Sequence, residues 1–208
     1  MELEEARQRI SVIHQNIVRG QFLHGYRAVP TFLSGLMAFV ACSVQGIWLA
    51  DDPNPCLILW VSAALVSVAI VAVEMLIRYR RADSTLERDM IIGAAEQFVP
   101  TLAAGALVTL VLWLFDEKQL WLLPGFWAVM LSMAIFASRR MLPGAVTIVG
   151  VHYLWTGLVC FAFGHDDKDM FFPAWTMACT FGAGQFLAAA ILYWSLERKE
   201  NPAGRHVS

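Results

Sequence analysis

The sequence predicts an all-α membrane protein with six transmembrane helices, arranged as three helical hairpins and preceded by an amphipathic N-terminal helix. Of the 208 residues, 58% are hydrophobic and only 15% are charged, whereas soluble domains average about 45–50% apolar and about 25% charged residues. The mean hydropathy is +0.58. The charged residues form short groups that leave six apolar runs between them, and runs of roughly 20 residues can cross a bilayer as helices.

The segment 1–28 is predicted to lie at the cytoplasmic membrane surface as an amphipathic helix. Ile10, Ile13 and Ile17 recur at three- and four-residue spacing, with arginine, histidine and glutamine between them, which is typical of an interfacial helix. The first residues show no basic segment followed by an apolar core, so we expect no cleaved signal peptide.

The transmembrane domain is predicted over 29–196, and a polar cytoplasmic tail over 197–208. Proline-containing or charged connections separate its apolar runs, as expected for turns between helices. The third span follows a polar connection in which Ser84 and Glu87 have the spacing of a helix capping box. We expect the spans at 29–50, 56–77, 92–115, 121–138, 143–164 and 173–196.

A short internal repeat supports the division into hairpins. Val-Pro-Thr occurs at 29–31 and again at 99–101, and glycine follows four residues later, at Gly35 and Gly105. Prolines also lie near the starts of the other four spans, at Pro55, Pro124, Pro143 and Pro173. An internal repeat is compatible with a transporter that binds its substrate at a repeat interface, and equally with a scaffold.

The distribution of basic residues predicts the orientation. Of the 15 lysines and arginines, 13 lie on the side of the termini, and only Lys118 and Lys168 lie in the opposite loops. Because cytoplasmic loops are enriched in basic residues, we expect a plasma-membrane protein with both termini in the cytoplasm. The net charge of −2 gives no reason to expect nucleic-acid binding. The 13 residues are Arg7, Arg9, Arg19, Arg27, Arg78, Arg80, Arg81, Arg88, Arg139, Arg140, Arg198, Lys199 and Arg205.

Charged and amide side chains near the predicted cytoplasmic ends of the spans form the first group of candidate functional residues. Arg78 follows Glu74 at i+4, and Glu96 and Gln97 begin the third span at a depth similar to that of Arg139. Since a carboxylate near hydrocarbon is costly unless it is paired or hydrated, we expect a structural layer of Glu–Arg contacts. The alternatives are a proton or cation relay through Glu74 and Glu96, and side chains that extend into water.

Deeper in the bilayer, His152 and Gln185 lie at similar predicted heights on the last two spans and are expected to form a hydrogen bond. A haem or metal role for His152 would require further ligands at its depth, so we expect no metal and no cofactor. The cysteines lack metal-ligand spacing, and whether Cys56 and Cys160 form a disulfide is left open. No nucleotide-binding or hydrolase motif is present, so we expect no enzymatic activity.

Three further stretches are the run from Arg27 to Gly35, the repeat at 99–105, and the closing run 182–193. Together they resemble small six-helix bacterial integral membrane proteins of uncharacterised function. Those proteins are often encoded beside a winged-helix regulator, so the resemblance implies a regulatory or stress-response context. They tend to carry a histidine in the last span, where this sequence has Gln185.

The sequence therefore predicts a non-enzymatic accessory or sensory and regulatory protein of the plasma membrane. Its contacts would be the lipid bilayer and a protein partner at the cytoplasmic face, while homo-oligomer formation is left open. The alternative is a small ion or small-molecule channel or transporter, in which the intramembrane glutamates, His152 and Gln185 line the path.

Overall fold

The computed structural model describes residues 28–49, 53–82, 84–140, 144–164 and 173–197, which are helical apart from short connections and include no strand. The predicted interfacial helix and cytoplasmic tail therefore lie outside the described residues, except for Ala28 and Glu197 at their boundaries. In chain order, the elements are α2 (Ala28–Val44), η2 (Gln45–Leu49), α3 (Pro53–Arg81), α4 (Thr85–Phe115), η3 (Glu117–Leu122), α5 (Leu123–Ala137), η4 (Ser138–Arg140), η5 (Gly144–Val146), α6 (Thr147–Phe163), α7 (Ala174–Met177), η6 (Ala178–Gly182), α8 (Ala183–Leu192) and η7 (Tyr193–Glu197).

Within the described residues, six helical stretches are long and apolar enough to cross a membrane. Their ends agree with the predicted ends to within a few residues, so the prediction of a multi-pass, all-helical membrane protein is confirmed. The stretches are Ala28–Leu49, Pro53–Arg81, Ile91–Phe115, Lys118–Ala137, Gly144–Phe163 and Ala174–Ser195.

Prolines begin several of these helices. Pro53 is the first residue of α3, Pro124 lies in the first turn of α5, and Pro173 caps α7. Proline fits these positions because the first N–H groups of a helix have no partner within the helix. Pro100 is different, since it lies inside α4, a position that membrane helices tolerate.

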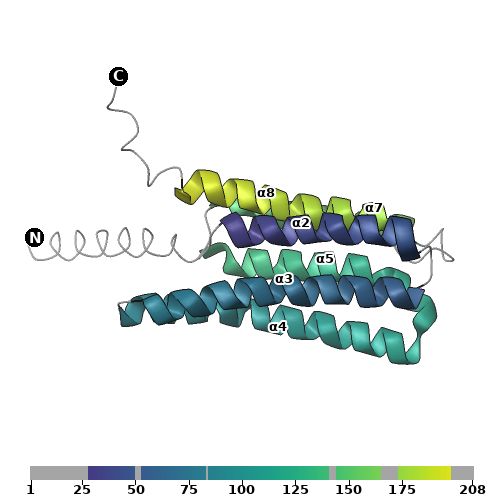
Figure 1. The fold of residues 1–208 in the computed structure, drawn as a ribbon, viewed down its shortest axis with the longest axis horizontal. Helices are drawn as coiled ribbons and strands as arrows, with labels where there is room; N and C mark the ends of the chain where they lie inside the picture. The colour runs from purple at the N-terminus through teal and green to yellow at the C-terminus, as the bar shows by residue number, and fades with distance from the viewer. Residues whose placement is uncertain (1–27, 50–52, 83, 141–143, 165–172, 198–208) are drawn as a thin grey trace, which may run out of the picture.

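The first and last spans lie side by side although they are far apart in the sequence (Figure 1). The most extensive helix pairs are α5 with α6 and α2 with α8, followed by α2 with α3 and α4 with α5. The two leading pairs each join different predicted hairpins, and the three-hairpin arrangement stays a prediction.

Glycines allow α2 and the last span to approach closely. A Cβ atom on Gly35 would lie 2.7 Å from Cδ1 of Phe186, and one on Gly182 would lie 2.6 Å from Cε2 of Phe39. The rings of Phe39 and Phe186 stack with their centroids 5.3 Å apart. Each helix thus places an aromatic ring on a glycine of the other, as expected where small residues govern helix packing in membranes.

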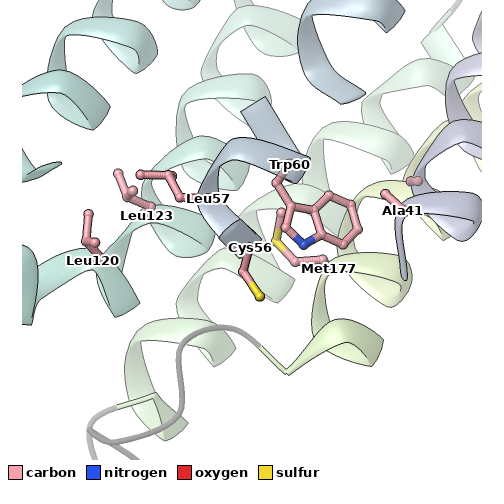
Figure 2. Close-up of a cluster of buried hydrophobic side chains, with 8 residues drawn as sticks. Ala41, Cys56, Leu57, Trp60, Leu120, Leu123 and Met177 are labelled. Carbon is pink, nitrogen blue, oxygen red and sulfur yellow. The ribbon is translucent and has the colours of Figure 1, made fainter. Parts of the chain in front are cut away.

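The buried side chains form two clusters, one toward each end of the bundle. In the first, the Trp60 indole of α3 extends toward Ala41 of α2 and Met177 of the last span (Figure 2). This cluster consists of Ala38, Ala41, Cys56, Leu57, Trp60, Leu120, Leu123 and Met177. The second consists of Ala28, Ala128, Ile135, Val146, Val149, Tyr153, Ala189 and Leu192.

Helices α3 and α4 are longer and less buried than the rest. They contain 29 and 31 residues, or about 43–47 Å at 1.5 Å per residue, against a hydrocarbon thickness of about 30 Å. Their joined ends project beyond the first turn of α2 (Figure 1). In the most apolar window of α4 no residue is buried, compared with 44% in the span that contains α5. We refer to α3 and α4 together as the peripheral pair, and to α2, α5, α6 and the last span as the body.

Candidate functional site

The deepest polar group in the body joins α6 to the last span. His152 Nε2 lies 3.1 Å from the backbone oxygen of Thr180, and the Tyr153 hydroxyl lies 3.5 Å from that of Phe181. Both acceptors belong to η6, a π-helical turn. The Thr180 oxygen also accepts the backbone N–H of Ala183, and because a carbonyl oxygen has two lone pairs it can take a side-chain donor as well. Because a carbonyl oxygen can only accept, the bond between His152 and Thr180 requires that the imidazole carries a proton on Nε2.

Tyr153 is the central side chain of this site. Only 1% of it is exposed, and Gln185 is a hydrogen-bond partner of its hydroxyl. The ring lies directly against the backbone of Gly184, where a Cβ atom would be 2.5 Å from Cζ of the ring. The phenol thus binds two positions of the last span and occupies the space that a side chain at residue 184 would need.

Two further polar residues extend the site along α6. The Thr156 hydroxyl donates to the His152 carbonyl at 2.9 Å, and Cys160 Sγ lies 4.0 Å from Oγ1 of the buried Thr180. His152, Thr156 and Cys160 follow at four-residue intervals and therefore share one face of α6. We call the group of His152, Tyr153, Thr156, Cys160, Thr180 and Gln185 the polar seam.

The polar seam can hold α6 and the last span in register. A side-chain hydrogen bond between membrane helices contributes about 0.6 kcal/mol on average and up to about 1.7 kcal/mol, so the several bonds here are a substantial part of the contact between α6 and the last span. Among the described residues, no three histidine, cysteine, aspartate or glutamate side chains are grouped so that they would hold a metal ion.

The predicted bond between His152 and Gln185 is replaced by two others. The two residues do lie in the same region, as their predicted heights indicated, but His152 binds the Thr180 carbonyl and Gln185 is a partner of Tyr153. The physical reason is the π-helical turn, which presents backbone acceptors to α6.

The predicted layer of Glu–Arg contacts is formed in part. Glu74 and Arg78 make an ion pair within α3, with both side chains about three-quarters or more covered. Glu96 and Arg139 are exposed, and the described side chains include no ion pair between them. Gln97 is half-buried and has an interaction partner.

A second buried polar pair, which sequence reasoning missed, lies near the opposite end of the bundle. The Trp60 indole N–H donates to Oε1 of Gln45 at 2.6 Å, and both side chains are buried. This bond joins α3 to η2. The only signal in the sequence was a glutamine among apolar residues late in the first span.

Two more indole bonds connect the peripheral pair. Trp113 of α4 donates to Asn54 of α3 at 3.1 Å, and Trp127 of α5 donates to Thr109 of α4 at 2.9 Å. Both bonds are more exposed to the surroundings than the Trp60–Gln45 bond. Helix α3 is attached to the body through the first buried cluster, whereas α4 adds these two more exposed polar contacts.

The six apolar helices and the buried polar seam define the class of the protein: an α-helical, multi-pass membrane protein. A comparison with protein-family models, with curated proteins and with solved structures found no match to this chain.

Proposed function

We propose that this chain is a non-enzymatic regulatory or sensory protein of the plasma membrane, and that the peripheral pair contacts a membrane partner. The observation that carries this proposal is the difference in packing between the two parts of the molecule. The body is held by glycine–aromatic contacts and by the polar seam, whereas no residue in the most apolar window of α4 is buried.

The glycines show this difference at atomic detail. In the body, a Cβ atom on Gly125 or Gly150 would lie 2.5 and 2.6 Å from the ring of an aromatic residue on the neighbouring helix. On α4, a Cβ atom on Gly105 would find its nearest neighbour at 3.8 Å, an ordinary van der Waals distance. Because membrane helices associate through close packing, α4 has free surface for a further helix.

The predicted orientation adds a second line of support. With both termini in the cytoplasm, the projecting ends of the peripheral pair lie on the cytoplasmic side. That end carries Arg78, Arg80 and Arg81 in the last turn of α3, where the helix dipole also favours positive charge. A reporter fused after residue 208 tests this orientation: a fluorescent C-terminal fusion that requires the cytoplasm should be active, and an active periplasmic phosphatase fusion would contradict it.

Photocrosslinking in native membranes tests the proposed contact. A benzoyl-phenylalanine at Leu107 or Leu114 of α4 should give a protein adduct of one defined mass. The matched controls are Val151 and Trp155 of α6, which are similarly exposed, at 53% and 68% compared with 61% and 60% for the α4 positions, and should give lipid adducts alone. Lipid adducts alone at α4, or equal protein adducts at both helices, would refute the proposal. An adduct of twice the chain mass would identify the partner as a second copy.

Transport is the alternative function, and the depth of the polar seam is the observation that favours it. Glu74 and Glu96 lie on the peripheral pair, whereas His152 lies between α6 and the last span, so a path through all three would have to cross between the two parts. Proton flux into liposomes that contain the purified protein tests this function. A flux that is lost in His152→Asn, with the fold intact, would establish transport and displace the regulatory proposal.

A further inference from the structure

The contacts between α2 and the last span define an antiparallel register. Gly35 contacts Phe186, and Phe39 contacts Gly182. A step of four residues forward along α2 thus corresponds to a step of four residues back along the last span, which is about one helical turn on each.

The next step in this register brings two cysteines together. Three residues beyond Phe39 is Cys42, and three residues before Gly182 is Cys179. Since residues three and four apart lie on one face of a helix, this register places Cys42 and Cys179 opposite each other at the interface between α2 and the last span. Helix α2 packs against η6, and the two thiols are close enough to interact electrostatically.

The surroundings of this pair favour close approach and access from the lipid. The neighbouring residues Ala41 and Ala178 are small and buried, as expected where two helix backbones come near each other. Cys42 is half-buried and Cys179 is exposed. At 1.5 Å per residue, Cys42 lies roughly 10 Å from the end of η2 and Cys179 roughly 8 Å from the start of α7. The thiols are therefore inside the apolar layer, at similar depth.

We propose that Cys42 and Cys179 form a reversible disulfide, and that the oxidant is a lipid-soluble quinone. As the S–S bond forms, each thiol loses one proton and one electron. The quinone takes up both protons and both electrons and becomes the quinol, so the step balances. A quinone dissolves in the layer where the pair lies, and the exposed Cys179 gives it access. The disulfide fixes α2 to η6, because the Cα atoms of a disulfide are held within about 7 Å.

The other two cysteines provide matched controls. Cys56 is fully buried on α3, and Cys160 lies on α6 against Thr180. Neither belongs to the register of α2 with the last span. A pairing of Cys42 with Cys179 is independent of the proposed role of the peripheral pair.

Counting free thiols in the full-length protein in lipid nanodiscs tests the pairing. The protein is exposed to decylubiquinone, denatured, and labelled with a maleimide polymer that shifts the band for each thiol. The reduced wild type should carry four labels, one for each cysteine, and the oxidised wild type two. Cys42→Ser and Cys179→Ser should each keep all three remaining labels after oxidation. Cys56→Ser and Cys160→Ser should each drop from three labels to one. The amount of quinol formed should equal the amount of disulfide.

Several outcomes overturn the proposal. Four labels on the oxidised wild type show that no pair forms. Loss of two labels in Cys42→Ser shows that a different pair forms. Pairing with water-soluble oxidised glutathione but not with the quinone eliminates the lipid-soluble oxidant. The count is repeated with Cys42→Ala and Cys179→Ala, so that a folding defect of one serine substitution does not decide the result.

Discussion

Substitution of Gly184 by alanine tests whether Tyr153 holds α6 against the last span. The added Cβ atom would lie 2.5 Å from Cζ of the Tyr153 ring, 2.7 Å from its hydroxyl oxygen and 2.9 Å from Cε1. All three distances are shorter than van der Waals contact. Because the ring is only 1% exposed, it has little room to withdraw, and the two helices must move apart or the ring must leave its place.

The magnitude follows from three terms. Overpacking of a filled core typically costs about 1–3 kcal/mol. Displacement of the Tyr153 hydroxyl from the Phe181 carbonyl costs roughly another 0.6 kcal/mol, the average for such a bond in a membrane. Alanine recovers about 0.8–1.0 kcal/mol of helix propensity relative to glycine. We therefore expect a net loss of about 1–3 kcal/mol in the free energy of unfolding.

Gly105→Ala is the matched control, since both glycines lie inside membrane helices. A Cβ atom at Gly105 would lie 3.8 Å from its nearest neighbour, on Trp127, so this variant gains helix propensity without strain. The propensity term is common to both variants, and their stabilities should differ by roughly 2–4 kcal/mol, which is the sum of the packing and hydrogen-bond terms.

Unfolding by sodium dodecyl sulfate from mixed micelles, followed by tryptophan fluorescence, measures both variants. Tyr153→Leu in the Gly184→Ala background removes the clashing ring atoms and should recover part of the loss, which gives a favourable coupling in the double-mutant cycle. If Gly184→Ala is as stable as Gly105→Ala, the ring does not occupy the position that the structure gives it, and the reasoning is refuted.

Three further predictions use the same assay. Trp60→Phe should destabilise the protein by about 1–3 kcal/mol, because it leaves the buried Oε1 of Gln45 without its indole donor; the added change Gln45→Leu should recover part of this, and no recovery would contradict the assignment. Glu74→Gln should cost no more than about 1 kcal/mol, since its pair with Arg78 is an i,i+4 contact within one helix, and a loss well above that would indicate a role beyond the ion pair. Ser132→Ala should cost roughly 0.6–1.7 kcal/mol, because the buried hydroxyl donates to a carbonyl of α6 at 2.8 Å, and an unchanged midpoint would show that this bond contributes nothing.

The spans were predictable from the sequence because their existence depends on local composition. An apolar run of sufficient length must form a helix in lipid, where every backbone polar group needs a partner within its own segment. Proline and charged residues then mark the ends, and Pro124 and Pro173 lie at helix starts as expected.

The pairing of the helices was not predictable on the same basis. In a soluble helix, the apolar face identifies the side that packs, but α2 and α8 carry apolar residues on the lipid-facing side as well as on the packed side. Contacts are set instead by small residues such as Gly35 and Gly182, and similar small residues occur on faces that do not pack closely, such as that of Gly105. Small residues in the sequence therefore do not distinguish a helix–helix interface from a lipid-facing surface.

The candidate site was predictable in part for a related reason. The depth of His152 was predictable because it follows from counting residues along a helix. His152 lies on α6, where it contacts the last span. Its partner is a backbone carbonyl of a π-helical turn, and neither a carbonyl nor such a turn has a distinctive side-chain pattern. Tyr153, which is not among the residues predicted from the sequence, is fully buried.

The cysteine pair and the peripheral pair are connected through the first buried cluster. Cys42 packs against this cluster, which contains Trp60 of α3. Three residues beyond Cys42, Gln45 accepts the Trp60 indole N–H. A disulfide that draws Cys42 toward η6 therefore pulls on the same turn of α2 and η2 that holds α3. Cys56 and Leu57 of α3 are buried in the same cluster, so the contact links the cysteine pair to the packing of α3 on α2.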